Sequence, residues 1–189
     1  MVRKGFSMIE LSMVILIIGI LFGVIVKGKD IYEASKVKGV EGQYNKIETA
    51  INAYFTKYGR YPGDGCTSAT PATPADCTGA IDNVLTTANE QAAFWYLLIN
   101  DTKMLSVSDR TSVFGAQWNV INVGTQNYLA FGAAGDVTSA SASIACAVDR
   151  GMDDGVNTTG NVLTSQAYDN TTDCWSLTGT STLQINLRF

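Results

Sequence analysis

The sequence of 189 residues contains no histidine and only three prolines. Without histidine, the chain lacks the commonest general base and the commonest metal ligand of proteins. Its four cysteines form no C-x-x-C pair, which argues against a zinc site or a dithiol redox motif. The G-x-S-x-G, phosphate-binding-loop and H-E-x-x-H motifs are also missing. We therefore expect no catalytic residues, no cofactor and no enzymatic activity.

Charge is distributed unevenly along the chain. Residues 1–58 contain eight Lys and Arg against five Asp and Glu, whereas residues 59–189 contain five against twelve. An acidic surface repels the phosphates of nucleic acids. The part after residue 58, which we call the head, is therefore not expected to bind nucleic acid.

What the sequence does have is one long apolar run near its N-terminus. Residues 6–26 contain a single charged residue, Glu10. As an α-helix the run spans about 31 Å at about 1.5 Å per residue, close to the hydrocarbon thickness of a bilayer. No small-residue cleavage site follows it, so we expect a retained transmembrane or filament-core helix rather than a secretory signal.

The acid in this run needs a partner. A carboxylate at the centre of a bilayer costs roughly 2.5–3.5 kcal/mol on insertion scales. The surrounding stretch KGFSMIE, residues 4–10, resembles the N-terminal signal of type IV pilins and of type II secretion pseudopilins. The resemblance implies that a prepilin peptidase removes the leader 1–5 by cutting between Gly5 and Phe6, and that Phe6 is then N-methylated. It also implies that Glu10 pairs with the terminal amine of Phe6 in a neighbouring subunit during filament assembly.

Residues 27–58 are predicted to continue the helix as an amphipathic stem. Apolar residues recur there at spacings of three and four, which places them on one helical face. Gly59 and Pro62 are suited to end the helix. The residues on the predicted face are Ile31, Ala34, Val37, Val40, Tyr44, Ile47, Ile51, Tyr54 and Tyr58.

The head, residues 59–189, is predicted to be a small antiparallel sheet with one short helix over 88–100. Runs typical of short strands occur at 117–123, 127–131, 144–148, 173–177 and 183–189. The expected fold class is therefore α+β, a long N-terminal helix packed on a small antiparallel sheet. This is also the ladle-shaped fold that the pilin resemblance implies.

The four cysteines predict two disulfides, because their number is even and they follow a membrane-type signal. Three pairings are possible. We favour the two that close local loops, Cys66 with Cys77 and Cys146 with Cys174.

A loop at 149–157 gathers side chains with oxygen atoms. We favour a turn in which Asp and Asn side chains bond the loop's own backbone. The alternative is a calcium site with Asp153, Asp154 and Asn157 as ligands, although their spacing is not that of an EF-hand.

Taken together, these patterns predict a structural subunit of an extracellular, type IV pilus-like filament. The expected partners are further copies of the chain, the prepilin peptidase, an inner-membrane assembly platform and membrane lipid before assembly. Two alternatives remain open: a pseudopilin in a periplasmic type II secretion filament, and a minor tip subunit that acts as an adhesion or binding module.

Overall fold

The computed structural model describes residues 7–131 and 140–188, and the side chains of these ranges except those of 25–30. Contacts divide the chain into two units, Met1–Ser35 and Lys36–Phe189.

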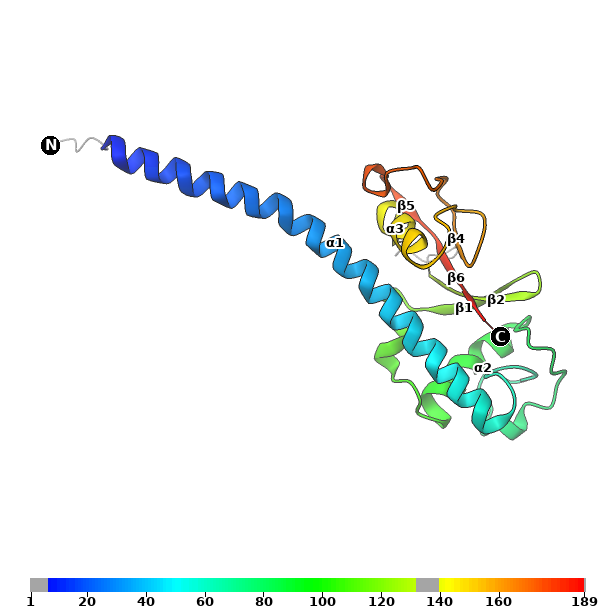
Figure 1. Ribbon diagram of the computed structural model, residues 1–189. Helices are drawn as coiled ribbons and strands as arrows, with labels where there is room; N and C mark the ends of the chain where they lie inside the picture. The colour runs from blue at the N-terminus through cyan, green and yellow to red at the C-terminus, as the bar shows by residue number, and fades with distance from the viewer. Residues whose placement is uncertain (1–6, 132–139, 189) are drawn as a thin grey trace. The chain divides into compact units, whose positions relative to one another are not determined.

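A single helix, α1 (Met8–Tyr58), accounts for 51 residues and belongs to both units (Figure 1). Neither Gly39 nor Gly42 interrupts it. The helix ends at Gly59, whose φ of 69° lies in the left-handed region and whose N–H donates to the carbonyl of Phe55 at 2.8 Å. This is the glycine C-cap that the sequence predicts.

Within the second unit, one face of α1 forms part of the hydrophobic core. The predicted stripe is buried from Val37 to Tyr54, whereas Ile31 and Ala34 are exposed and Tyr58 is half-buried. At Gly39 the head approaches the helix closely, because a Cβ there would lie 2.6 Å from Cγ1 of Val113. The buried members of the face are Val37, Val40, Tyr44, Ile47, Ala50, Ile51 and Tyr54.

The main sheet of the head has four antiparallel strands in the order β1-β2-β6-β4. Their bounds are β1 (Asn119–Val123), β2 (Gln126–Phe131), β4 (Val162–Thr164) and β6 (Leu183–Leu187). The C-terminal strand β6 is central, and its alternate residues Leu183, Ile185 and Leu187 are at most 1% exposed. The Tyr44 hydroxyl donates to the carbonyl of Asn186 at 2.8 Å, which ties α1 to this strand. A second, two-stranded sheet pairs β3 (Ala140–Ser141) with β5 (Thr180–Ser181).

Two α-helices accompany the sheets, α2 (Ala88–Tyr96) and α3 (Ala142–Met152). Thr87 caps α2 in a capping box with Glu90, and a π-helical turn over Leu97–Asp101 follows the helix. Short 3₁₀ turns occupy Pro74–Asp76, Val107–Arg110 and Cys174–Ser176. The helix predicted over 88–100 therefore exists, with its second part wound more loosely than an α-helix.

The fold class is α+β, an N-terminal helix whose second part packs on a small antiparallel sheet, as the sequence predicts. Two of the five predicted strands are wrong. Residues 144–148 lie in α3, where the Ser141 hydroxyl caps the helix and the buried residues Ile144, Ala145 and Val148 follow helical spacing. Residues 173–177 contain the 3₁₀ turn Cys174–Ser176, whose backbone is held by the carboxylate of Asp173.

Candidate functional site

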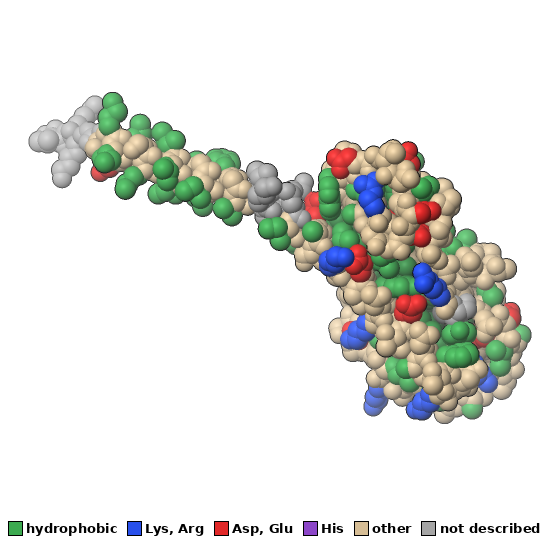
Figure 2. All heavy atoms as spheres, viewed as in Figure 1, with side chains coloured by type: hydrophobic (Ala, Val, Ile, Leu, Met, Phe, Trp, Pro, Cys, Tyr) green, Lys and Arg blue, Asp and Glu red, His purple; other side chains and the backbone are tan. Residues whose placement is uncertain are grey.

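The most unusual surface of the chain is the apolar segment of α1, residues 8–24. Its large hydrophobic side chains are between 46% and 89% exposed, and apolar side chains line the face of this helix that Figure 2 shows. Soluble monomeric proteins rarely expose so many contiguous apolar side chains, so such a surface marks an interaction site. The exposed residues are Met8, Ile9, Leu11, Met13, Val14, Ile15, Leu16, Ile17, Ile18, Ile20, Leu21, Phe22 and Val24.

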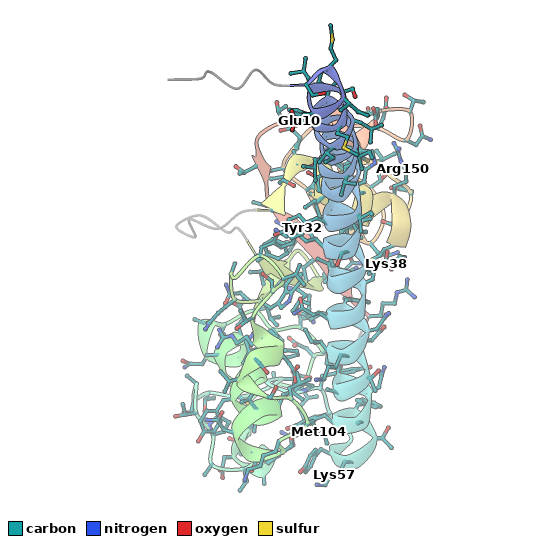
Figure 3. The ribbon with its side chains drawn as sticks, turned by 90° about the vertical axis from the view of Figure 1, so that its left-hand side faces the viewer. Glu10, Tyr32, Lys38, Lys57, Met104 and Arg150 are labelled. Carbon is teal, nitrogen blue, oxygen red and sulfur yellow. A yellow bond between two sulfur atoms is a disulfide. The ribbon has the colours of Figure 1, made fainter. Side chains whose placement is uncertain are left out.

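Glu10 lies in the first turn of α1 and caps that helix (Figure 3). Its Oε2 accepts the backbone N–H of Ser7 at 2.8 Å, while the Ser7 hydroxyl accepts the N–H of Ile9 at 3.3 Å. The spacing Ser-x-x-Glu before an apolar run is a known signal for a helix start, and it is the local pattern that could have predicted this cap. The acid is therefore held at the helix start, where the unsatisfied N–H groups and the helix dipole favour a negative charge.

The other residues of the processing signal, Gly5 and Phe6, lie outside the described residues. Cleavage, methylation and the pairing of Glu10 with Phe6 therefore stay predictions. Within the described part of the chain, no helix is both long enough and apolar enough to cross a membrane.

The acidic loop after α3 is organised around its own backbone. Asp153 Oδ2 accepts the N–H groups of Asn161 and Val162, the latter at 2.9 Å. Asp154 accepts the N–H of Val156 at 2.9 Å and the hydroxyl of Thr159 at 2.7 Å. This is the favoured interpretation of the loop, in which carboxylates stabilise turns.

Three carboxylates of this region could supply metal-ligand atoms within 4.8 Å of one another, those of Asp149, Asp153 and Asp154. Asp153 and Asp154 belong to the predicted calcium set. The third member of that set, Asn157, accepts the N–H of Thr164 at 3.0 Å with its backbone carbonyl. The hydrogen bonds that Asp153 and Asp154 make are those of a turn. The calcium site stays a prediction.

Asp149 is fully buried, which no pattern in the sequence indicates. Burial raises its pKa to about 6, although the Tyr168 hydroxyl, which donates at 2.8 Å, and the N–H of Gly155 favour the charged form. The Tyr168 hydroxyl in turn accepts from Thr164 at 3.0 Å. Asp149 thus belongs to a buried hydrogen-bond network that joins α3 to the segment after β4.

Both disulfides of the structure follow the local-loop preference. Cys66 pairs with Cys77, and Cys146 pairs with Cys174, leaving no free cysteine in the described chain. The first closes the loop between α1 and α2, whose backbone also receives the Arg60 guanidinium at the carbonyl of Cys77. The second fastens α3 to the 3₁₀ turn before β5.

No family model matches the sequence, and no curated protein matches it. Among solved structures, the chain is similar to the major type IV pilin PilA1 from Clostridium difficile, with 16% sequence identity, coverage of 85% of this chain and 98% of that chain, and a TM-score of 0.44. A likeness at this level does not establish a family.

Proposed function

We propose that this chain is the structural subunit of a helical, type IV pilus-like filament. In such a filament, the apolar segments of many copies cover one another. The observation that supports this most directly is the exposure of thirteen large hydrophobic side chains along one stretch of α1. The resemblance of residues 4–10 to the processing signal of pilins and pseudopilins points in the same direction.

The apolar surface has to stay out of water both before and after assembly. Burying one Leu, Ile or Phe side chain from water contributes about 1.5–3 kcal/mol, which favours lipid or a filament core over solvent. Because the helices pass from one apolar environment to another, packing and register, more than hydrophobicity, would hold the filament core. The acidic head is expected to face solvent.

The second part of the proposal concerns register. Cleavage between Gly5 and Phe6 would create an ammonium group next to Ser7, whose N–H already donates to Glu10. A carboxylate held at that point can pair with the amine of its own chain or with that of a neighbour. Removing one partner of a buried ion pair costs about 3–5 kcal/mol, so a pair between chains would fix the axial position of each subunit.

Storage in the inner membrane, with release by an assembly platform, belongs to the same proposal. The same assembly chemistry would serve a pseudopilin of a type II secretion system. The location of the filament distinguishes the two. Filaments outside the cell that vanish on deletion of the chain indicate a pilus, whereas a secretion defect without such filaments indicates a pseudopilus.

The test of assembly is a pair of substitutions in the native cell. Glu10→Gln keeps the size of the side chain and the helix but removes the charge. The N-terminal amine of Phe6 would then be buried in the filament without a partner, which is costly. We therefore expect at least about a tenfold loss of sheared filaments with unchanged amounts of protein. Glu48→Gln, an acid-to-amide change on the later part of the same helix, is the matched control and should leave the yield unchanged. Equal filament yields from both variants would refute the register role of Glu10.

Mass spectrometry of the purified protein tests the processing step. The expected mature chain lacks residues 1–5, carries one added methyl group at Phe6 and contains four fewer hydrogens, because both disulfides are formed. A protein isolated with Met1 in place would contradict the processing signal.

A further inference from the structure

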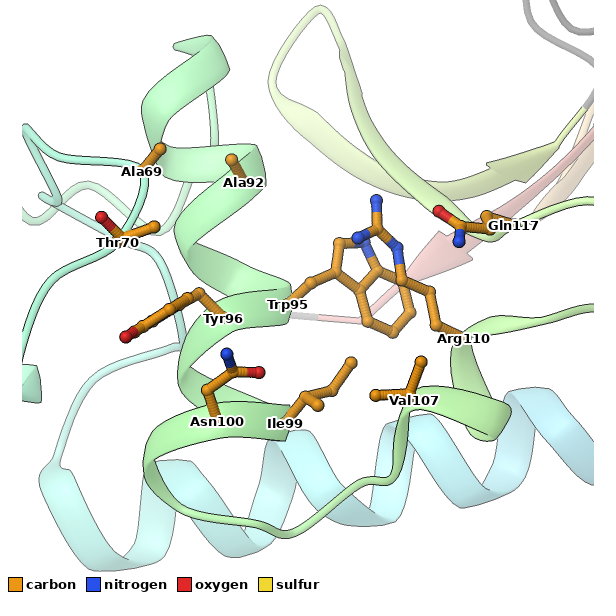
Figure 4. A pocket seen from close by; sticks show the side chains of 10 residues that line it. All are labelled: Ala69, Thr70, Ala92, Trp95, Tyr96, Ile99, Asn100, Val107, Arg110 and Gln117. Atoms are coloured by element: carbon orange, nitrogen blue, oxygen red, sulfur yellow. The ribbon is translucent and has the colours of Figure 1, made fainter.

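The head contains two adjoining cavities that flank the same pair of side chains, Trp95 and Arg110. The first, of ≈ 310 Å³, lies between the end of α2, its π-helical turn and the 3₁₀ turn Val107–Arg110 (Figure 4). The second, of ≈ 300 Å³, lies toward β1 and shares Ala92, Trp95 and Arg110 with the first. Both cavities are open, and both are lined by the basic side chain of Arg110. Neither cavity has an acidic residue in its lining.

The Trp95 indole, which lines both cavities, has a buried N–H group without an acceptor among the described residues. Trp95 is only 3% exposed, and no described residue accepts a hydrogen bond from its buried Nε1. Buried donors without a partner are rare in folded proteins and call for an explanation. The other buried tryptophan of the head, Trp118, does have one, since its Nε1 donates to Gln43 Oε1 at 3.3 Å.

Arg110 places further donors beside this N–H. Its guanidinium lies 5.3 Å from the centre of the Trp95 ring, and Figure 4 shows the two side chains against one another at the cavity. Two contacts fix it: Nε donates to the carbonyl of Trp118 at 3.1 Å, and Nη2 donates to Asn119 Oδ1 at 3.2 Å. Its Nη1 group donates to no described residue. The site therefore offers a positive charge and several donors, which is the chemistry that a carboxylate requires.

The walls of the first cavity combine apolar surface with two side-chain amides. Asn100 and Gln117, both exposed, supply side-chain amides that make no hydrogen bond with the described residues. An amide presents a donor and an acceptor side by side, which matches neighbouring hydroxyl groups. Ile99, Val107 and Tyr96 provide apolar surface for the C–H face of a ring.

We propose that the first cavity binds an acidic sugar, a hexuronic-acid type of ring. Its carboxylate lies against the guanidinium of Arg110, beside the Trp95 ring, and its hydroxyls lie against the amides of Asn100 and Gln117. An acidic side chain of a protein would meet the guanidinium equally well, but it would leave both amides without hydroxyl partners. The inference does not depend on filament assembly, and it gives a concrete form to the alternative role of the head as a binding module.

The indole signals of the tryptophans provide a direct test with the full chain in detergent. The protein has three tryptophans, so a ¹⁵N-tryptophan sample gives three indole N–H signals, which single Trp→Phe variants assign. Titration with methyl β-D-glucuronide should move the Trp95 signal and leave those of Trp118 and Trp175 in place, with a dissociation constant on the order of 1 mM. The neutral methyl β-D-glucoside has the same ring without the carboxylate and should bind at least about tenfold more weakly, since it forgoes the charge-assisted bonds.

Substitutions in the walls separate a built site from a surface charge. Asn100→Ala and Gln117→Ala change exposed side chains with no partner among the described residues, so the fold is retained and the affinity should fall severalfold. Asn52→Ala, an exposed amide on α1 outside both cavities, is the control and should change nothing. Three results would overturn the proposal: no movement of the Trp95 signal, equal affinity for the glucoside or for acetate, or tighter binding of an aspartate-rich peptide than of the glucuronide.

Discussion

The two halves of helix α1 place their apolar side chains in opposite surroundings. From Met8 to Val24 every large hydrophobic side chain is exposed, whereas from Val37 to Tyr54 one face of the same helix is buried against the head. The difference lies in the pattern. The first half is apolar all around the helix, and the second is apolar on one side only, which is the arrangement that a single partner surface can cover. A helix apolar on all sides needs partners on all sides, and the described part of the chain does not supply them.

The largest difference between the two halves is expected when one isoleucine in each is shortened to alanine. Ile47 is 0% exposed, so Ile47→Ala should lower the free energy of unfolding by about 2–5 kcal/mol. Ile17 is 56% exposed, so Ile17→Ala should change it by less than about 0.5 kcal/mol. Chemical denaturation of both detergent-solubilised variants measures the difference. Similar losses in the two variants would mean that the apolar segment is already covered within one chain.

A second contrast concerns pH, which should act on the interior of the head. Burial raises the pKa of Asp149 to about 6 from an ordinary value of 3.8. The buried acid stabilises the fold only in its protonated form. Its contribution to the free energy of unfolding is therefore fully present below about pH 4 and is lost as the pH rises through about 6, a loss on the order of 2–3 kcal/mol. Asp149→Asn should remove this slope and leave a protein that is more stable than the wild type at about pH 7.

The measurement is the free energy of unfolding of both proteins between about pH 4 and about pH 7, which brackets the titration of the buried acid. Other carboxylates cancel in the difference. One of these is Asp169, whose pKa is lowered to about 2 by hydrogen bonds from Thr171 and Thr172. Parallel pH profiles for wild type and variant would show that Asp149 does not titrate in this range.

Gly39 and Gly42, three residues apart on α1, differ in how closely the head approaches the helix. A Cβ at Gly39 would lie 2.6 Å from Cγ1 of Val113, whereas nothing lies within 4 Å of one at Gly42. Gly42→Ala should stabilise the protein by up to about 1 kcal/mol through helix propensity. Gly39→Ala should be less stable than Gly42→Ala by about 1–3 kcal/mol, because the head must shift to admit the methyl group. Thermal unfolding of the pair tests this, and equal melting temperatures would argue against the close approach.

The smallest expected effect comes from the rim of the same surface. Lys46 Nζ lies 2.7 Å from Asp109 Oδ1, but the lysine side chain is 59% exposed. Exposed ion pairs contribute about 0.2–1 kcal/mol and are screened by salt. Lys46→Met should therefore cost less than about 1 kcal/mol in dilute buffer, and this cost should shrink in concentrated salt. A loss that is large and independent of salt would place this pair among the main contacts between α1 and the head.

Local signals in the sequence predicted much of this fold. The helical periodicity after residue 36, the Gly59 cap and the alternation in β6 each depend on neighbouring residues, and each is found in the structure. Local patterns did not predict the structure of residues 144–148, because a short apolar run fits a strand or a buried helix equally well. Only the Ser141 cap and the position of α3 in the fold decide between them.

The functional features also divide into those that a local pattern predicts and those that depend on the fold. The exposed apolar segment and its acid are visible in the sequence, and the Ser7–Glu10 cap follows from its Ser-x-x-Glu spacing. Burial of Asp149 and the meeting of Trp95 with Arg110 depend on segments that are distant in sequence or on how a turn packs. No local pattern encodes such contacts.

The two disulfides have a consequence for a protein placed under tension. Each disulfide carries the tension directly from one cysteine to the other. The segments between the bonded cysteines, which are 11 and 28 positions apart in the sequence, therefore do not lengthen when the ends are pulled. At about 3.4 Å per extended residue, roughly 120 Å of contour is withheld from stretching while both crosslinks are intact. A head pulled open by force would therefore yield in a shorter step than its length suggests, and a reducing agent would restore the missing extension.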